Sequence, residues 1–155
     1  MISTIRRILP HMAIGLGLTF ASQASAATIG DYDGDGKADR TVFRPSSGTW
    51  YVDTGTGVGV VWGQAGDIPV PGDYDGDGKA DRAIFRPSSG MWFVDTGTGV
   101  GVVWGQAGDI PVPGDYDGDG KIDRAIFRPS NGDWYVDTGT GAPVVWGQAG
   151  DIPLP

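Results

Sequence analysis

A period of 42 residues runs through most of the chain and constrains its fold more than any other feature of the sequence. Residues 30–71, 72–113 and 114–155 are three copies of one unit. The first two copies differ at four positions and the last two at seven. Such a repeat predicts similar structural modules stacked in sequence order, each contacting its neighbours. We therefore divide the chain into blades at 27–71, 72–113 and 114–155, preceded by an N-terminal segment at 1–26.

Within a repeat, short runs of β-branched and aromatic residues alternate with turns rich in glycine and proline. For the second repeat we expect an extended segment at residues 68–74, which begins before the repeat and leads into it, and further segments at 82–86, 91–95 and 100–104. No window free of glycine or proline shows helical periodicity. Four short strands in about 40–45 residues is the size of one β-propeller blade. The sequence therefore predicts an all-β fold of three four-stranded propeller blades.

Each repeat contains an acidic loop, Asp-Tyr-Asp-Gly-Asp-Gly-Lys-x-Asp, with aspartates at positions 1, 3, 5 and 9. Calcium takes about six to eight oxygen ligands at about 2.3–2.6 Å. Carboxylates on alternate residues, with a backbone carbonyl at position 7, can wrap such an ion. Gly78, at position 6 of the second loop, permits the sharp turn that this requires. The three loops predict up to three calcium ions, one per repeat.

These residues resemble the FG-GAP and VCBS family of bacterial repeats, which is related to the calcium-binding blades of integrin α-chain propellers. The resemblance covers residues 27–155 and is most specific over 72–81, followed by the strand at Ile84 and Phe85. It implies that the acidic loop joins the first two strands of a blade and holds calcium. The ligands it implies are four aspartate side chains and one lysine carbonyl per loop: Asp31, Asp33, Asp35, Lys37 and Asp39; Asp73, Asp75, Asp77, Lys79 and Asp81; and Asp115, Asp117, Asp119, Lys121 and Asp123.

Two other interpretations of the acidic loops remain open. An EF-hand or dockerin loop begins similarly, but an EF-hand needs a bidentate acid at position 12 and flanking helices. Position 12 is Val42, Ile84 or Ile126 in this chain, and a proline follows three residues later. The second alternative is that the aspartates are solvated turn residues that bind no ion.

Composition narrows the classes of function. Once Arg6 and Arg7 are set aside, nine basic residues remain against nineteen aspartates, so residues 27–155 carry a net charge of −10. This balance argues against binding nucleic acid, which needs a basic surface, and against docking on anionic membranes. The only histidine is His11, and residues 27–155 contain neither cysteine nor glutamate. The usual catalytic triads and glutamate pairs are impossible, and we expect no enzyme activity.

The N-terminal segment predicts export. Arg6 and Arg7 precede an apolar run at 12–20, and Ala24-Ser25-Ala26 supplies a small-residue cleavage site. This pattern is typical of a secretory signal peptide cut after Ala26. The alternative is a membrane anchor, but a spanning helix needs about 20 apolar residues. We expect a secreted or periplasmic protein that is not inserted in a membrane.

Two sets of side chains are candidates for contacts with a ligand. The tryptophans Trp50, Trp92 and Trp134 either form a stacking platform for sugars or fill the space between blades. The arginines Arg44, Arg86 and Arg128 precede proline and are expected to pair with loop aspartates, with a ligand role as the alternative. Two functions follow: a non-catalytic adhesion or protein-interaction module, and a calcium-stabilised lectin for an extracellular glycan.

Three blades raise a problem of closure. An open arc exposes apolar faces at both ends, whereas closed propellers typically have about four to eight blades. Two chains paired head to tail would complete a six-bladed ring. In such a homodimer, residues 151–155 of one chain would lie beside the first blade of the other. The alternative is an array that stays open.

Overall fold

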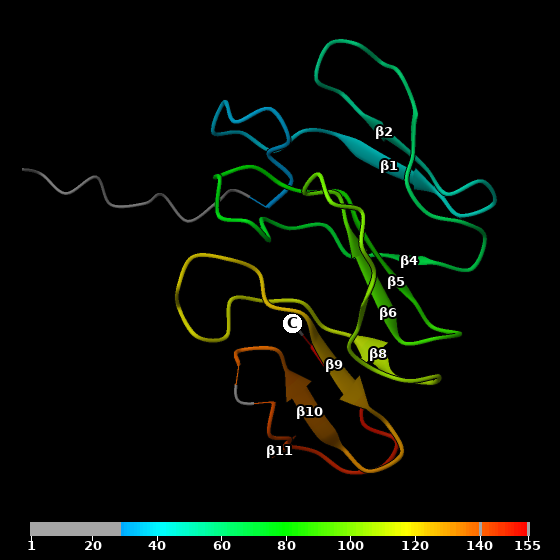
Figure 1. Ribbon diagram of the computed structural model, residues 1–155, viewed down its shortest axis with the longest axis vertical. Helices are drawn as coiled ribbons and strands as arrows, with labels where there is room; N and C mark the ends of the chain where they lie inside the picture. The colour runs from blue at the N-terminus through cyan, green and yellow to red at the C-terminus, as the bar shows by residue number, and fades with distance from the viewer. Residues whose placement is uncertain (1–28, 140, 155) are drawn as a thin grey trace, which may run out of the picture.

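The computed structural model describes residues 29–139 and 141–154, and within these ranges it contains three antiparallel sheets and no helix. The first sheet is β1 (Thr41–Arg44), β2 (Thr49–Val52) and β3 (Val60–Val61). The second is β4 (Ile68–Pro69), β5 (Ala83–Arg86), β6 (Met91–Val94) and β7 (Val102–Val103). The third is β8 (Ile110–Pro111), β9 (Ala125–Arg128), β10 (Asp133–Val136) and β11 (Val144–Val145). The sheets follow one another from top to bottom of Figure 1, which confirms the predicted all-β class with repeated sheets.

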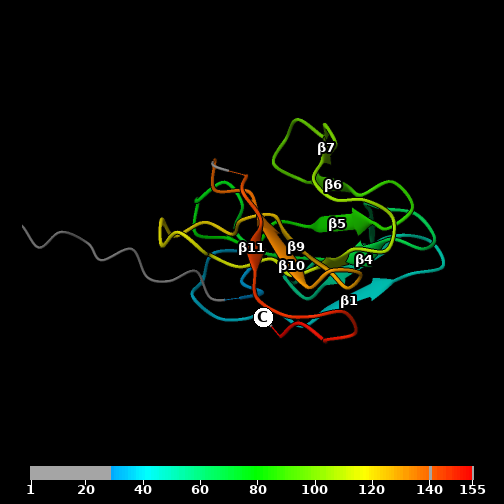
Figure 2. The same ribbon diagram turned by 90° about the horizontal axis from the view of Figure 1, so that it is seen from below.

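The second and third sheets each take their first strand from the residues of the preceding repeat. Ile68 pairs with Phe85 and Pro69 with Ile84, although residues 68–69 precede the second repeat in the sequence. Figure 2 shows the resulting order from β4 to β7, with β7 at the outer edge. β8 pairs with β9 in the same way. Among the described residues, the first sheet has no counterpart of β4.

A glycine turn closes the central hairpin of each sheet. In the second sheet Phe85 pairs with Trp92, and the amide of Gly90 donates to the carbonyl oxygen of Arg86 at 2.9 Å. Gly90 has a φ of 67°, and a Cβ at this position would lie 2.3 Å from the backbone of Gly105. Both the left-handed backbone and the close approach require glycine.

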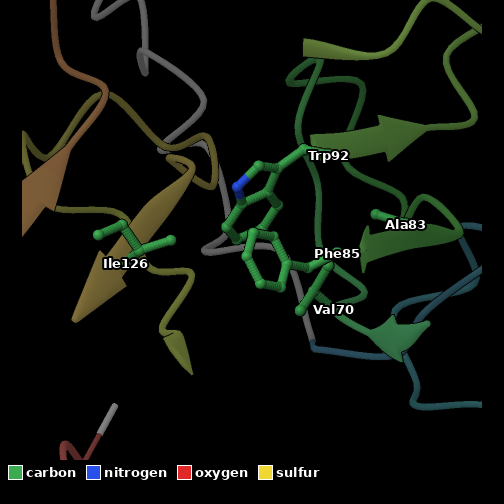
Figure 3. Packing of buried hydrophobic residues seen from close by; sticks show 5 residues of the cluster. All are labelled: Val70, Ala83, Phe85, Trp92 and Ile126. Atoms are coloured by element: carbon green, nitrogen blue, oxygen red, sulfur yellow. The ribbon is translucent and has the colours of Figure 1, made fainter. Parts of the chain in front are cut away.

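The hydrophobic core lies between successive sheets. The rings of Phe85 and Trp92 have centroids 5.3 Å apart, and Ile126 of the third sheet belongs to the same buried cluster (Figure 3). Ile84 and Ile126 are fully buried, whereas Val42, at the same position of the first sheet, is 62% exposed. The face of the central strand that carries these residues is thus covered in the second and third sheets, but not in the first.

The outer strands are shorter than the sequence predicted. The expected segments at 68–74 and 100–104 contain only the two-residue strands β4 and β7, whereas the two middle segments lose one residue each. Pro69 and Pro71 lack the backbone N–H that a longer ladder at β4 would use. Tyr74 consequently lies in the acidic loop instead of in a strand.

Candidate metal centres

Backbone hydrogen bonds fix the shape of each acidic loop. In the second loop, the carboxylate of Asp73 accepts the amides of Gly76 at 2.6 Å and Gly78 at 2.9 Å. The carboxylate of Asp81 accepts the amide of Tyr74 at 2.9 Å, which joins the end of the loop to its start. The same three bonds recur in the first and third loops. The loops are therefore shaped by the protein's own hydrogen bonds.

Three carboxylates converge in each loop. They are the aspartates at positions 1, 3 and 9, whose nearest oxygens all lie within 4.8 Å of one another: Asp31, Asp33 and Asp39; Asp73, Asp75 and Asp81; Asp115, Asp117 and Asp123. Hard oxygen donors of this kind suit calcium. We call these three sets the aspartate triads.

The aspartates at position 5 lie outside the triads. Asp77 accepts the amide of Lys79 at 2.8 Å, and Asp119 accepts that of Lys121 at 2.8 Å. Asp35 also forms an ion pair with the ammonium group of Lys37 at 2.7 Å. Ligation by Asp35, Asp77 and Asp119, and by the carbonyl groups of Lys37, Lys79 and Lys121, stays a prediction from the resemblance.

The crowding of negative charge is visible at the ninth position of the loop. Burial, together with the neighbouring carboxylates of Asp75, Asp73 and Asp77, raises the pKa of Asp81 from 3.8 to about 6. The hydrogen bond from the amide of Tyr74 partly opposes this rise. Burial also raises the pKa of Asp123 in the third loop. A cation bound by the triad would neutralise this repulsion.

Neighbouring loops are hydrogen-bonded to one another. The amide of Ala80 donates to the carbonyl oxygen of Asp31 at 2.6 Å, and the amide of Ile122 donates to that of Asp73 at 2.7 Å. In Figure 1 the three loops lie along one side of the molecule, coloured blue, green and yellow. Asp31 and Asp73 are consequently buried, whereas Asp115 is exposed. Sequence reasoning missed this contact, because the pattern within one repeat does not show which residues of the next repeat cover it.

The strand-end arginines pair with aspartates outside the acidic loops, which corrects our prediction. Arg86 makes two hydrogen bonds of 2.9 Å to Asp67, and Arg128 makes the equivalent pair with Asp109 at 2.9 and 2.8 Å. These aspartates lie in the turns before β4 and β8. Because β4 and β8 pair with the sheet that follows, each aspartate lies beside the arginine of that sheet. Arg44 instead donates to the hydroxyl of Tyr51.

The candidate stacking tryptophans face the interior. Trp50 and Trp92 are 1% and 0% exposed, so neither presents a ring face to a sugar, and Trp134 is partly buried. Their indole N–H groups donate to the carbonyl oxygens of Trp62, Trp104 and Trp146 in the same order. These rings fill the sheets, which was the alternative to the sugar platform.

Comparison with known proteins gives the chain no relative: no family model, curated protein or solved structure matches it. The fold and the site themselves define a class, an all-β protein of repeated antiparallel sheets that each carry an aspartate triad able to hold a metal ion. Within the described residues there is no helix long and apolar enough to cross a membrane. The predicted signal peptide at 1–26 lies outside the described residues.

Proposed function

We propose that this chain is a secreted calcium-binding repeat protein of β-propeller type, related to the FG-GAP and VCBS repeats, that acts as a non-catalytic binding or adhesion module. The observation that carries the proposal is the triad of aspartates, repeated three times at identical loop positions. Calcium would be held by the triad carboxylates and would bring the two ends of each acidic loop together. The metal's contribution in this proposal is structural.

Calcium suits the triads better than a transition metal does. Residues 27–155 offer no imidazole or thiolate, the ligands that favour zinc or copper. Magnesium demands a near-ideal octahedron, whereas calcium accepts irregular sets of oxygen ligands. A loop in which three carboxylates converge supports the second kind of site. A weak affinity, of about 10⁻⁴–10⁻³ M as in extracellular modules, would suffice outside the cell.

A binding module fits the chemistry of the chain better than an enzyme does. Residues 27–155 lack histidine, cysteine and glutamate. The carboxylates that remain outside the loops are largely engaged in ion pairs, such as Arg82 with Asp95 at 2.6 Å and Arg124 with Asp137 at 2.7 Å. The predicted signal peptide supports the same assignment, because calcium reaches about millimolar concentration outside the cell. A lectin that stacks sugars on Trp50 and Trp92 is disfavoured, since both rings are buried.

Calorimetric titration of the metal-depleted chain tests the proposal. We expect about three calcium ions per chain, little response to magnesium at the same concentration, and an increase in thermal stability on binding. The variant Asp75→Asn should lose one ion without unfolding, because Asp75 is exposed and belongs to one triad. A chain that binds no calcium at millimolar concentration would refute the metal assignment.

A further inference from the structure

The contacts between neighbouring sheets form one set that occurs twice in the chain. The indole of Trp62 donates to the carbonyl oxygen of Phe93 at 3.3 Å, and that of Trp104 donates to Tyr135 at 3.2 Å. The two arginine–aspartate pairs and the two bonds between acidic loops accompany these contacts. Each interface thus has two faces. The face of the earlier sheet, which carries the tryptophan and the aspartate, is called the acceptor face, and the face of the following sheet, which carries the arginine, is called the donor face. The names refer to the sheets and not to hydrogen bonds.

The third sheet presents an acceptor face that nothing in the described chain covers. Trp146, the counterpart of Trp62 and Trp104, is 79% exposed. Asp151 accepts the amide of Gln148 at 3.0 Å, as Asp109 accepts that of Gln106, yet Asp151 is exposed and has no arginine partner among the described residues. A hollow of about 370 Å³ lies beside them, with Phe127 and Trp134 among its lining residues.

The first sheet presents the matching donor face. Val42 is 62% exposed, although its counterparts Ile84 and Ile126 insert between sheets and are fully buried. The guanidinium of Arg44 lies 4.6 Å from the ring centroid of Tyr51, close to the 4.5 Å that separates Arg86 from its own ring partner. Arg44 is therefore held in the orientation in which its counterparts meet an aspartate, with no carboxylate opposite it in the described chain.

Among the described residues, no strand occupies the first position of the first sheet, and a matching segment is exposed after the third. Ile152 and Leu154, the counterparts of residues in and after β4 and β8, are both 82% exposed. A hollow of about 280 Å³ on the first sheet is lined by Tyr32 and Trp50, among others. The buried hydroxyl of Tyr32 has no hydrogen-bond partner in the described part of the chain.

In the other two repeats, the tyrosine hydroxyl that corresponds to that of Tyr32 has a hydrogen-bond acceptor. Tyr74 donates to the carbonyl oxygen of Val70 at 2.7 Å, and Tyr116 donates to that of Val112 at 2.7 Å. Val70 and Val112 directly follow β4 and β8 and are both buried. Leu154 is their counterpart in the 42-residue register. The unpartnered phenol is thus aimed at the position where a segment equivalent to residues 152–154 would lie.

We propose that the acceptor face of one copy of this chain binds the donor face of a second copy, and that residues 152–154 of the first complete the open sheet of the second. Val42 then enters the hollow beside Trp134 and Trp146. Arg44 pairs with Asp151, and Tyr32 donates to the carbonyl oxygen of Leu154. Every contact repeats one that the chain already makes internally, so the two surfaces match in shape and in charge.

Two copies joined in this way bring together six of the described sheets. This number lies within the range of about four to eight blades in which propellers close. A head-to-tail contact either closes into a ring or propagates into an open fibre. Two such contacts per pair of chains would cover both ends and leave neither face exposed, so we expect a closed dimer.

A charge-reversal cycle tests the contact in the full chain, with calcium present so that loop folding is not limiting. Arg44→Asp and Asp151→Arg should each weaken the dimer at least about 30-fold, because each places like charges together in a desolvated contact. The double variant restores opposite charges at both interfaces and should recover most of the affinity. The readout is molar mass by light scattering and sedimentation across a concentration series.

Two further variants separate docking from folding. Thr98→Asp adds a charge on an exposed turn of the second sheet, which presents neither of the two docking faces, and should leave the dimer intact. Leu154→Asp should prevent strand completion and give a monomer with unchanged far-ultraviolet circular dichroism. A wild-type monomer at every concentration overturns the docking proposal. Species larger than two chains overturn closure, and a double variant no better than the single ones overturns the Arg44–Asp151 pairing.

Discussion

The backbone amide of Ile122 donates a hydrogen bond of 2.7 Å to the carbonyl oxygen of Asp73. Ile122 directly precedes the last aspartate of the third acidic loop, and Asp73 is the first aspartate of the second loop. Asp73 also belongs to the triad of its own loop. The contact therefore joins two candidate metal centres by a single hydrogen bond, and Asp31 and Ala80 repeat it between the first and second loops. The packing of neighbouring sheets thus directly involves the backbone of a candidate metal centre.

Removal of calcium should destabilise the whole chain. When the free calcium concentration is about ten times the dissociation constant, each site adds about 1.4 kcal/mol to the free energy of unfolding. Three such sites add about 4 kcal/mol. We expect thermal unfolding to shift by more than 10 °C between chelator and saturating calcium, since about 1 kcal/mol moves the midpoint of a domain of this size by several degrees. Sodium chloride at equal ionic strength is the control. An unchanged midpoint in chelator would argue against structural calcium.

The triads predict an order of importance among the loop aspartates. Asp75→Asn should lower calcium affinity at the second site more than Asp77→Asn does, because Asp75 converges with Asp73 and Asp81 whereas Asp77 lies outside the triad. Both residues are exposed, so neither change should unfold the protein. Calorimetry on both variants gives the comparison. Equal losses would instead favour the wider ligand set that the family resemblance implies.

Stability should depend on pH in opposite senses with and without calcium. The pKa of Asp81 is raised to about 6 in the folded chain, above the ordinary 3.8, so the folded state binds the proton more tightly than the unfolded state. This contribution to stability is complete below pH 3.8 and is lost as the pH rises through about 6. Metal-depleted protein should lose this contribution between about pH 4 and 6, whereas calcium-loaded protein should gain stability as protons leave the site.

Thermal unfolding across this pH range, with metal removed by dialysis, measures the effect. Asp81→Asn is the matched control, because the amide does not titrate and its metal-free slope should be smaller. A metal-free slope that is the same in both proteins would exclude Asp81 as its origin.

The ion pair between Arg86 and Asp67 should contribute more to stability than the exposed pair in the first sheet. The side chain of Asp67 is 1% exposed and that of Arg86 is 23% exposed, so Arg86→Leu leaves a buried carboxylate without its partner. We expect a loss of about 3 kcal/mol or more in the free energy of unfolding. Arg40→Leu, at a side chain that is 91% exposed, should cost less than about 1 kcal/mol. Denaturant titration of both variants tests the difference.

Two glycines with similar backbone conformations should respond differently to alanine. Gly90 and Gly97 have φ values of 67° and 90°, and alanine at either position adds backbone strain of about 1–2 kcal/mol. Only at Gly90 would the new Cβ collide with another backbone segment, at 2.3 Å, whereas nothing lies within 4 Å at Gly97. Gly90→Ala should therefore be clearly the more destabilising in thermal unfolding. Equal effects would mean that the hairpin shifts to accommodate the methyl group.

The sequence predicted the elements of the fold better than the contacts between them. Runs such as residues 82–86 and 91–95 have strand composition and a Pro-to-Gly turn between them, so the central hairpin follows from local chemistry. The partners of Arg86 and the burial of Trp92 depend instead on which residues of other repeats lie nearby. A pattern read within one repeat does not carry that information.

The candidate sites show the same division. Alternate aspartates predict that carboxylates gather, and the structure brings positions 1, 3 and 9 together. The exclusion of position 5 depends on the turn at Asp77, whose side chain accepts the amide of Lys79. The burial of Asp73 depends on the next loop. Neither feature has a signature in the spacing of the acidic residues.

The last strand of one repeat pairs with the sheet of the next repeat, and this arrangement affects how such a chain can change in length. Because β4 and β8 make the same pairings with the sheets that follow them, duplication or loss of one whole unit recreates a junction that already exists. No new interface between neighbouring repeats has to evolve. An insertion or deletion of another length within the strands between Asp67 and Arg86 would instead shift the register that brings the two residues together. Gene rearrangement in multiples of this unit thus leaves every interface intact.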